Sequence, residues 1–274
     1  MKKLILPVLA VLSLGTASAQ FNLGISVGYG LGSPGHVLGT NTNSAGSFSE
    51  KNIYGTLGTG FQANLTPGYM FGDHFGIELG LNGFFGSKTT VGEATTPGGN
   101  YKHTQASTQF RVSPAFVVKS GGEKISVYAR AGLVLPLMGS VKSEINDATT
   151  PGVTSIMELK TSGKVSMGYT GAVGLNVHFG SKMAFFAEVG ANSLRVKSKD
   201  TELTKYSVNG NDVLGNVPTY SKETKYVDEL TGSSNNASVN PTGTNPNNAK
   251  EDLRQVANFS NFFIQVGFKF SFGD

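Results

Sequence analysis

Strict alternation of apolar residues with small or polar ones constrains this chain more than any other feature. It first appears after residue 20, where every second residue from Phe21 to Leu31 is apolar and the residues between them are glycine, serine or asparagine. Successive side chains of a β-strand point to opposite faces of a sheet, so a period of two predicts a strand with one apolar face.

The alternation recurs in eight segments. They cover residues 21–31, 53–71, 75–87, 104–119, 125–141, 158–179, 183–196 and 258–272. Short, turn-forming connections at 72–74, 120–124 and 180–182 alternate with long connections at 33–52, 88–103, 142–157 and 197–257. Short turns at one end and long polar loops at the other are typical of a transmembrane barrel.

The first nineteen residues have the pattern of a secretory signal peptide. Lys2 and Lys3 precede a short apolar core, and the segment 17–19, Ala-Ser-Ala, provides small residues before a cleavage at Gln20. The apolar core is too short for a spanning helix. We therefore expect residues 1–19 to be removed on export and residues 20–274 to form one β-barrel domain.

Composition excludes several classes of protein. The chain has 274 residues without a cysteine, which excludes a disulfide scaffold, a thiolate metal site and a cysteine nucleophile. Charged residues make up only 15%, against about 25% in a typical globular protein. The formal net charge is +4, and two of those charges lie in the predicted signal peptide. A charge this small does not favour nucleic acid as a partner.

The choice between a soluble and a membrane barrel depends on which face points inward. A soluble eight-stranded barrel such as a lipocalin alternates too, with its apolar side inside. Here the alternate positions occupied by small or polar residues, which we call the polar phase, also carry many glycines, among them Gly24, Gly28, Gly174 and Gly190. The apolar positions between them are the apolar phase. An eight-stranded lumen is only wide enough for side chains to fill, so it favours such small residues. The polar phase is therefore predicted to face inward and the apolar phase, including Leu57, to face lipid.

Aromatic residues of the apolar phase gather near the short-turn end of the predicted strands. They are Phe21, Tyr69, Phe71, Phe75, Phe179, Phe185, Phe270 and Phe272. Aromatic side chains are enriched where a barrel crosses the membrane–water interface. These eight residues are predicted to form one interfacial girdle.

Two segments carry a resemblance to known proteins. The final alternation from Phe262 to Phe272 resembles the last strand of outer-membrane barrels, which the barrel assembly machinery reads. The segment 67–77, Pro-Gly-Tyr-Met-Phe-Gly-Asp-His-Phe-Gly-Ile, resembles a recurring strand–turn–strand unit of such proteins. Residues 20–272 thus resemble the small outer-membrane barrels of the OmpA and OmpX type, including those common in Bacteroidetes-like bacteria.

The resemblance implies an all-β fold: an eight-stranded antiparallel up-and-down transmembrane β-barrel with short periplasmic turns and long extracellular loops. It also implies a place in the outer membrane of a Gram-negative cell. Outer-membrane lipid and lipopolysaccharide would then be its neighbours, and the assembly machinery its partner during biogenesis.

Charged and amide residues on the inward phase are the first candidate site. They are Glu78, Arg111, Arg130, Glu188 and Lys269, with Gln109 and Asn176. Acids and bases within a narrow lumen are expected to pair, because an unpaired charge there is costly. We expect these residues to form one hydrogen-bonded plug that closes the barrel, as in the related small barrels. A gated ion path through the same residues is the alternative.

The histidines allow a less favoured interpretation, in which they belong to a catalytic site. Some eight-stranded barrels modify lipid A with a histidine, a serine and a carboxylate, and His36 or His103 could pair with Ser47, Ser107 or Asp147. The spacing does not require such a pair, and surface polar residues are the strongly favoured explanation of these positions. No metal-ligand spacing is present. We predict no enzyme activity, no metal and no cofactor.

The long connection 197–257 is the second candidate site. Its first half alternates and predicts a hairpin beyond the membrane, whereas residues 231–249 are rich in Ser, Asn, Gly, Thr and Pro and are predicted to be mobile. Long loops on a rigid scaffold tend to carry binding. Either a surface ligand or host partner meets the chain here, or the connection is only a hydrophilic cap.

Three functions are compatible with this pattern. The favoured one is a structural or surface-interaction scaffold with a plugged lumen. A narrow channel, or a transporter with a lateral exit for small or hydrophobic solutes, is the alternative, and a lipid-modifying enzyme ranks last. Bulky residues on the inward phase argue against a wide aqueous pore: Phe84, Tyr128, Met138, Phe186 and Phe263.

Overall fold

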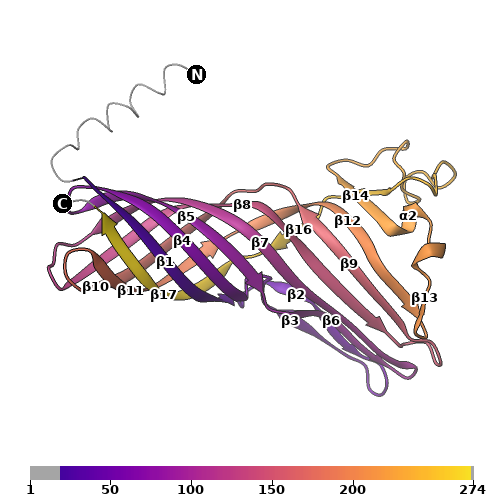
Figure 1. Cartoon of the computed structure of the whole chain (residues 1–274). Coiled ribbons are helices and arrows are strands. Elements are labelled where there is room, and N and C mark those ends of the chain that lie inside the picture. Colours follow the sequence, from indigo (N-terminus) through magenta and orange to yellow (C-terminus); the bar gives the residue numbers. More distant parts are fainter. Residues whose placement is uncertain (1–18, 273–274) are drawn as a thin grey trace.

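The computed structural model describes residues 19–272. The predicted signal peptide, apart from Ala19, lies outside the described residues. Eight long strands form a closed antiparallel barrel, which confirms the predicted fold class (Figure 1). They are β1 (Ala19–Gly32), β4 (Gly60–Phe71), β5 (Phe75–Gly86), β7 (Gly99–Lys119), β8 (Ile125–Asp147), β10 (Gly168–His178), β11 (Met183–Ser193) and β17 (Asn261–Phe272).

Each barrel strand pairs with its neighbour along the chain, and β17 closes the barrel by pairing with β1 from Phe21 opposite Phe272 to Gly32 opposite Asn261. Tight turns join β4 to β5, β7 to β8 and β10 to β11 where they were predicted. Gly72 and Gly180 adopt φ values of +82° and +77° in two of these turns, a conformation that glycine allows at little cost.

The apolar phase of the strands faces outward. Ile25 and Ile264 are more than half exposed, whereas Ser26 and Gln265, the residues that follow them, are buried inside the barrel. A continuous outward apolar band is stable only in lipid. The part of the chain that the structure describes contains no helix long and apolar enough to cross a membrane.

Much of the connections 33–52, 88–103 and 142–157 is strand and not the loop that was expected, whereas the hairpin expected in the first half of 197–257 is present as an antiparallel pair of strands, residues 195–208 and 223–227. β7 and β8 have 21 and 23 residues, well beyond the roughly 9–11 that cross a bilayer, so both project from the barrel. Further strands add to their free edges. These are β6 (Thr89–Thr96), β2 (Val37–Asn43) and β3 (Ser49–Tyr54) beside β7, and β9 (Ser155–Gly163), β12 (Arg195–Val208), β14 (Glu223–Val227) and β15 (Lys250–Leu253) beside β8.

We call this extension, in the order β3-β2-β6-β7-β8-β9-β12-β14-β15, the outer sheet (Figure 1). β2 with β6 and β14 with β15 are its parallel pairs, and its other neighbours are antiparallel. Four short elements complete the described chain. They are β13 (Asn211–Asp212), the 3-10 turn η1 (Leu214–Asn216), α2 (Thr219–Lys222) and β16 (Val256–Asn258).

Four segments predicted as continuous strands are broken, and two of the breaks are short: segment 183–196 is interrupted at Leu194 and segment 258–272 at residues 259–260. Segment 53–71 stops at residues 55–59, between Gly55 and Gly60 with φ of +147° and +156°, and segment 158–179 stops at residues 164–167. The break in segment 53–71 turns the chain inward, so Leu57, predicted to face lipid, is only 5% exposed. Met138 was predicted to face the lumen but is 67% exposed, because a bulge in β8 opposite Phe110 shifts the alternation.

Close packing inside the barrel gives a direct stability prediction. A Cβ atom on Gly190 would lie 2.5 Å from Cζ of Phe263 and 2.7 Å from Cβ of Ala172. Gly190→Ala is expected to lower the free energy of unfolding by about 1–3 kcal/mol, because the extra methyl group overpacks the lumen. Urea titration followed by gel mobility of unheated samples measures it.

Gly171 provides the matched control. It lies on the neighbouring strand β10, and the nearest atom to a Cβ there would be 3.8 Å away. Gly171→Ala should therefore change the unfolding midpoint little, and equal effects of the two variants would contradict the packing described here.

Candidate functional site

Glu188 on β11 is the centre of a polar network across the lumen. Its carboxylate is 3% exposed and receives the Arg130 guanidinium at 2.5 and 3.0 Å, the Tyr128 hydroxyl at 2.7 Å and the Gln265 amide at 2.5 Å. Arg130 and Tyr128 lie on β8, which is separated from β11 by β10. The ion pair is bidentate and charge-assisted, which makes it one of the stronger hydrogen-bond arrangements in proteins.

Gln265 extends this network toward the other side of the barrel. Its Oε1 atom accepts hydrogen bonds from Gln62 at 3.2 Å and from Asn64 at 3.0 Å, both on β4. Asn82 on β5 in turn donates to Asn64 at 2.5 Å. Side chains of β4, β5, β8, β11 and β17 are thus tied together inside the lumen.

A second ion pair crosses the lumen between Lys269 on β17 and Glu78 on β5, with 2.7 Å between Nζ and Oε1. β1 and β4 separate these two strands in the barrel wall. Both side chains are largely buried. The pair therefore spans the interior and does not run along one face of the sheet.

The other predicted lumen residues form separate contacts. Arg111 donates from Nε to Gln109 at 2.8 Å and stacks on the Phe84 ring, with 4.0 Å to its centroid. Asn176 donates to the Ser126 hydroxyl at 3.1 Å, and Ser126 lies 3.0 Å from Nε2 of His178. All seven predicted residues lie inside the barrel, but in four groups and not in the single network that was expected.

Five members of the polar network around Glu188 were not predicted as polar contacts from the sequence. Gln62, Asn64, Asn82 and Gln265 lie on the inward phase, and the alternation alone would have found them if amides had been weighted like charges. Tyr128 was predicted to face the interior only as a bulky side chain. Nothing in the sequence indicates the hydrogen bond that its hydroxyl donates to Glu188.

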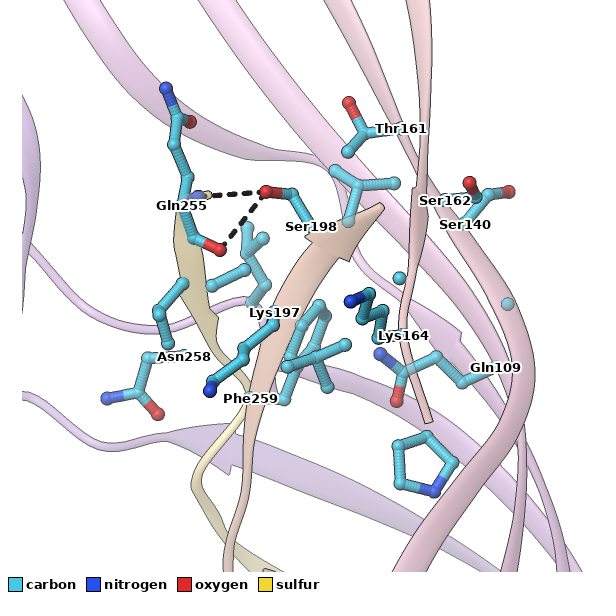
Figure 2. Close-up of a pocket in the computed structure, with 18 of the residues that line it drawn as sticks. Gln109, Ser140, Thr161, Ser162, Lys164, Lys197, Ser198, Gln255, Asn258 and Phe259 are labelled. Atoms are coloured by element: carbon cyan, nitrogen blue, oxygen red, sulfur yellow. Dashed lines mark hydrogen bonds between the residues drawn. The ribbon is translucent and has the colours of Figure 1, made fainter. Parts of the chain in front are cut away.

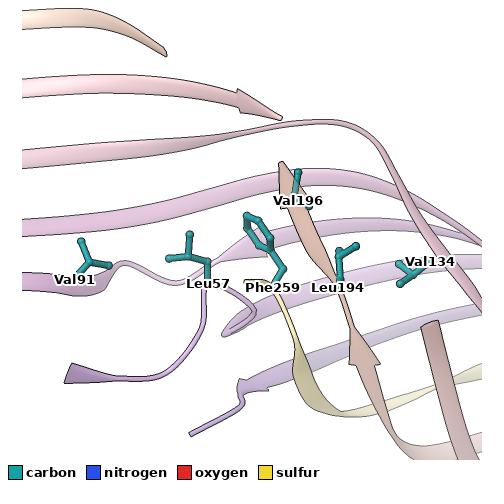
Figure 3. Packing of buried hydrophobic residues seen from close by; sticks show 6 residues of the cluster. All are labelled: Leu57, Val91, Val134, Leu194, Val196 and Phe259. Carbon is teal, nitrogen blue, oxygen red and sulfur yellow. The ribbon is translucent and has the colours of Figure 1, made fainter. Parts of the chain in front are cut away.

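An apolar cluster lies where the barrel meets the outer sheet (Figure 3). We call it the apolar cap, and it consists of Leu57, Val91, Val134, Leu194, Val196 and Phe259. Leu57, Leu194 and Phe259 lie where strands are interrupted, and backbone hydrogen bonds join these interruptions. The Leu57 N–H donates to the Asn258 carbonyl at 2.9 Å, and the Phe259 N–H donates to the Leu194 carbonyl at 2.8 Å. The cap thus packs the junction between the barrel and the outer sheet.

A cavity of about 340 Å³, here called the outer pocket, lies beside the apolar cap (Figure 2). Leu57, Met138 and Phe259 give it apolar walls, and Lys164 and Lys197 add two cations. Ser198 joins β12 to the Gln255 backbone on its rim, with hydrogen bonds of 2.9 and 3.1 Å (Figure 2).

The wall of the barrel is interrupted at this pocket. β8 pairs with β10 up to Val134 and with β9 from Ser140 onward, so its residues between these points have no ladder partner on that side. Residues 164–167, which face this stretch, form no strand. Pro136, Leu137 and Gly139 line the outer pocket at the interruption.

In the described part of the chain, the structure does not bring His36 or His103 into contact with the residues considered as their catalytic partners. Within residues 19–272, His36 and His103 form no hydrogen bond with Ser47, Ser107 or Asp147. Burial lowers the pKa of His103, whose ring lies 3.5 Å from the Gln105 amide. The described residues also contain no group of three or more potential ligands that would hold a metal ion.

The eight aromatic residues predicted as a girdle lie on the outward face at the short-turn end. Phe21 packs on Phe272 with ring centroids 5.8 Å apart, and Tyr69 packs on Phe71 at 5.2 Å. Phe75 and Phe179 are more than half exposed. Phe185 and Phe270 are half-buried on the same face. Their role at a membrane interface stays a prediction.

Comparison with known proteins gives one family and several solved structures. The family described as the outer membrane protein beta-barrel domain matches residues 4–217. No curated protein matches the chain.

Three solved structures are similar to this chain. Outer membrane protein OprG from Pseudomonas aeruginosa is 13% identical, with 94% of this chain and 97% of that chain covered and a TM-score of 0.46. Neisserial surface protein A is 11% identical, with 93% and 99% covered and a TM-score of 0.43. CarO2 from Acinetobacter baumannii is 13% identical, with 92% and 99% covered and a TM-score of 0.31.

Proposed function

This chain belongs to the family of outer membrane protein beta-barrel domains, and we propose that it is a closed, non-enzymatic scaffold of the outer membrane that acts through its outer sheet. The observation that carries the proposal is the filled lumen. Two ion pairs, Arg130 with Glu188 and Lys269 with Glu78, cross the interior, and the apolar cap lies above them. A water-filled path through the barrel would require both the ion pairs and the packing of the apolar cap to be disrupted.

The outer sheet offers the interaction surface. It extends the barrel by strands that pair with one another, so the backbone that carries its exposed side chains is ordered. Arg254 strengthens the region 197–257 by bonding the Ser198 carbonyl at 2.6 Å and Asp228 at 2.7 Å. This guanidinium holds the pKa of Asp228 below its usual value.

The part predicted to be mobile, residues 231–249, contains no strand or helix but is held by Asn235. The amide nitrogen of Asn235 donates to the carbonyls of Asn245, Asn248 and Ala249 at 2.9–3.1 Å. Its Oδ1 atom accepts from the Asn245 N–H at 2.7 Å. One side chain thus fixes both ends of a turn-rich segment that is available for binding a surface ligand or host partner.

Lipid is the second expected contact. Lys164, Arg195 and Lys197 are exposed where β10, β11 and β17 end and the outer sheet begins. Cations at this level are suited to the phosphate groups of lipopolysaccharide. The barrel assembly machinery would be a further partner during biogenesis, through β17.

Photo-crosslinking in intact cells tests the scaffold proposal. A photoreactive amino acid replaces Glu202 on β12 or Lys51 on β3, which are both exposed on the outer sheet. We expect a cross-linked product of defined mass from at least one of these positions. The same probe at Phe75, at the short-turn end, should give lipid adducts only. Absence of any defined product from both outer-sheet positions would contradict the proposal.

A lateral-exit transporter is the second candidate, and the interrupted wall beside the outer pocket favours it. The chain contains no tryptophan, so Met138→Trp would place a single reporter at that opening. A transporter predicts that a medium-chain fatty alcohol shifts the emission of this tryptophan to shorter wavelength. Phe48→Trp, on an exposed residue outside the pocket, is the control. Unchanged emission at both positions would exclude this candidate.

A further inference from the structure

Arg111 is the most deeply buried cation of the predicted lumen set, and it has no carboxylate partner among residues 19–272. Arg130 pairs with Glu188 and Lys269 pairs with Glu78, which uses both acids of the predicted lumen set. Arg111 is 1% exposed, more deeply buried than either paired cation. No carboxylate of this set is therefore left to balance the charge of Arg111.

The contacts of Arg111 do not balance that charge. Nε donates to the neutral amide oxygen of Gln109, and the flat face of the guanidinium lies on Phe84. Nη2 has no hydrogen-bond partner within the described residues. A buried charge without a partner is strongly unfavourable, and a cation–π contact is worth only about 2 kcal/mol even when desolvated. A counter-charge next to the guanidinium would remove most of this cost.

A small cavity adjoins the unpaired guanidinium. Its volume is about 30 Å³, which exceeds the roughly 10–15 Å³ that a single water molecule needs. Arg111 and Arg130 both line it, together with the hydroxyl-bearing Ser113 and Thr170 and the amide of Asn82. No residue that lines it carries a carboxylate. The cavity is thus surrounded by two cations and several possible hydrogen-bond donors.

From this geometry we propose that the lumen binds one small monovalent anion of the size of chloride, held between Arg111 and Arg130. Chloride is only slightly larger than water and accepts hydrogen bonds from guanidinium and hydroxyl groups alike. Water would fill the same space but would leave the charge of Arg111 unbalanced. The anion would be a structural part of the closed lumen, and it requires no conducting path.

Bromide provides the direct test, because it replaces chloride and scatters X-rays anomalously. Crystals of the refolded barrel grown in sodium bromide should show an anomalous peak in the cavity, within contact distance of the Arg111 guanidinium. Electron density for water alone, without an anomalous peak at this position, would overturn the proposal.

A second test uses the residue directly opposite Arg111. Asn82 on β5 pairs with Arg111 on β7 in the strand register, and its Oδ1 atom also has no hydrogen-bond partner within the described residues. Asn82→Asp keeps the shape of the side chain and places a carboxylate beside the guanidinium. Ser113→Asp adds a carboxylate from another wall of the same cavity if the first variant does not fold.

The expected result is a loss of anion dependence. Wild-type protein should unfold at a higher urea concentration in sodium chloride than in an equal concentration of sodium gluconate, whose anion is too large for the cavity. Asn82→Asp should show no such shift and no bromide peak. The proposal is overturned if wild type is equally stable in both salts, or if the variant retains the full difference.

Discussion

Glu188→Gln is expected to lower the free energy of unfolding by about 3–5 kcal/mol, because it leaves a buried charge without its partner. The substitution keeps the size of the side chain but removes the negative charge that Arg130 meets at 2.5 and 3.0 Å. It also weakens the acceptor for the Tyr128 hydroxyl and the Gln265 amide. Urea unfolding of the refolded barrel, followed by gel mobility without heating, measures the change.

Glu144→Gln is the control for this experiment. Glu144 forms an ion pair of similar length, 2.8 Å, with Lys88, but on the exposed outer sheet. Exposed pairs contribute about 0–1 kcal/mol, so this variant should unfold close to wild type. Equal losses of unfolding free energy in the Glu144 and Glu188 variants would show that the buried lumen pair stabilises the barrel no more than an exposed pair does.

Phe259→Ala is expected to lower the free energy of unfolding by a similar amount, because Phe259 belongs to the apolar cap, the second layer proposed to close the lumen. Phe259 is 1% exposed at the centre of the apolar cap, and truncation of a buried phenylalanine costs about 3–5 kcal/mol. The variant should also be cut faster by an external protease at residues 55–59 and 254–260, which the cap holds together. Both the unfolding midpoint and the cleavage rate are measured on protein in detergent.

Phe48→Ala provides the comparison. Phe48 is 71% exposed in the connection between β2 and β3, so its truncation removes little packing. We expect an unfolding midpoint within error of wild type and an unchanged cleavage rate. A Phe259→Ala variant that behaves like Phe48→Ala would mean that the cap does not hold the junction of barrel and outer sheet.

The barrel itself was predictable because a strand that separates lipid from a filled lumen must alternate along its whole length. The same argument placed Glu78, Arg130 and Glu188 on the inward face. It did not give their partners, because Glu78 meets Lys269 across two intervening strands. Contacts of that kind depend on the tilt and register of the closed barrel, which local patterns do not contain.

Only part of the outer sheet was predictable from alternation, which indicated the hairpin that contains β12 and the strand that contains most of β9. β2 and β6 are rich in Thr, Gly and Asn and have polar residues on both faces. They become strands because β7 projects beyond the barrel and offers an unpaired backbone edge, with which β6 pairs before β2 pairs with β6. The inward turn that buries Leu57 was missed as well, because it depends on the backbone conformations of Gly55 and Gly60.

Current across a planar bilayer tests the central claim, that side chains close the lumen, most directly. Refolded protein, with folding verified by its gel mobility, is added to the membrane under an applied voltage in potassium chloride. The structure predicts no discrete conductance steps above those of the protein-free bilayer. Steady steps that change in size when Arg130 or Glu188 is neutralised would contradict a closed lumen and establish an ion path through the polar network.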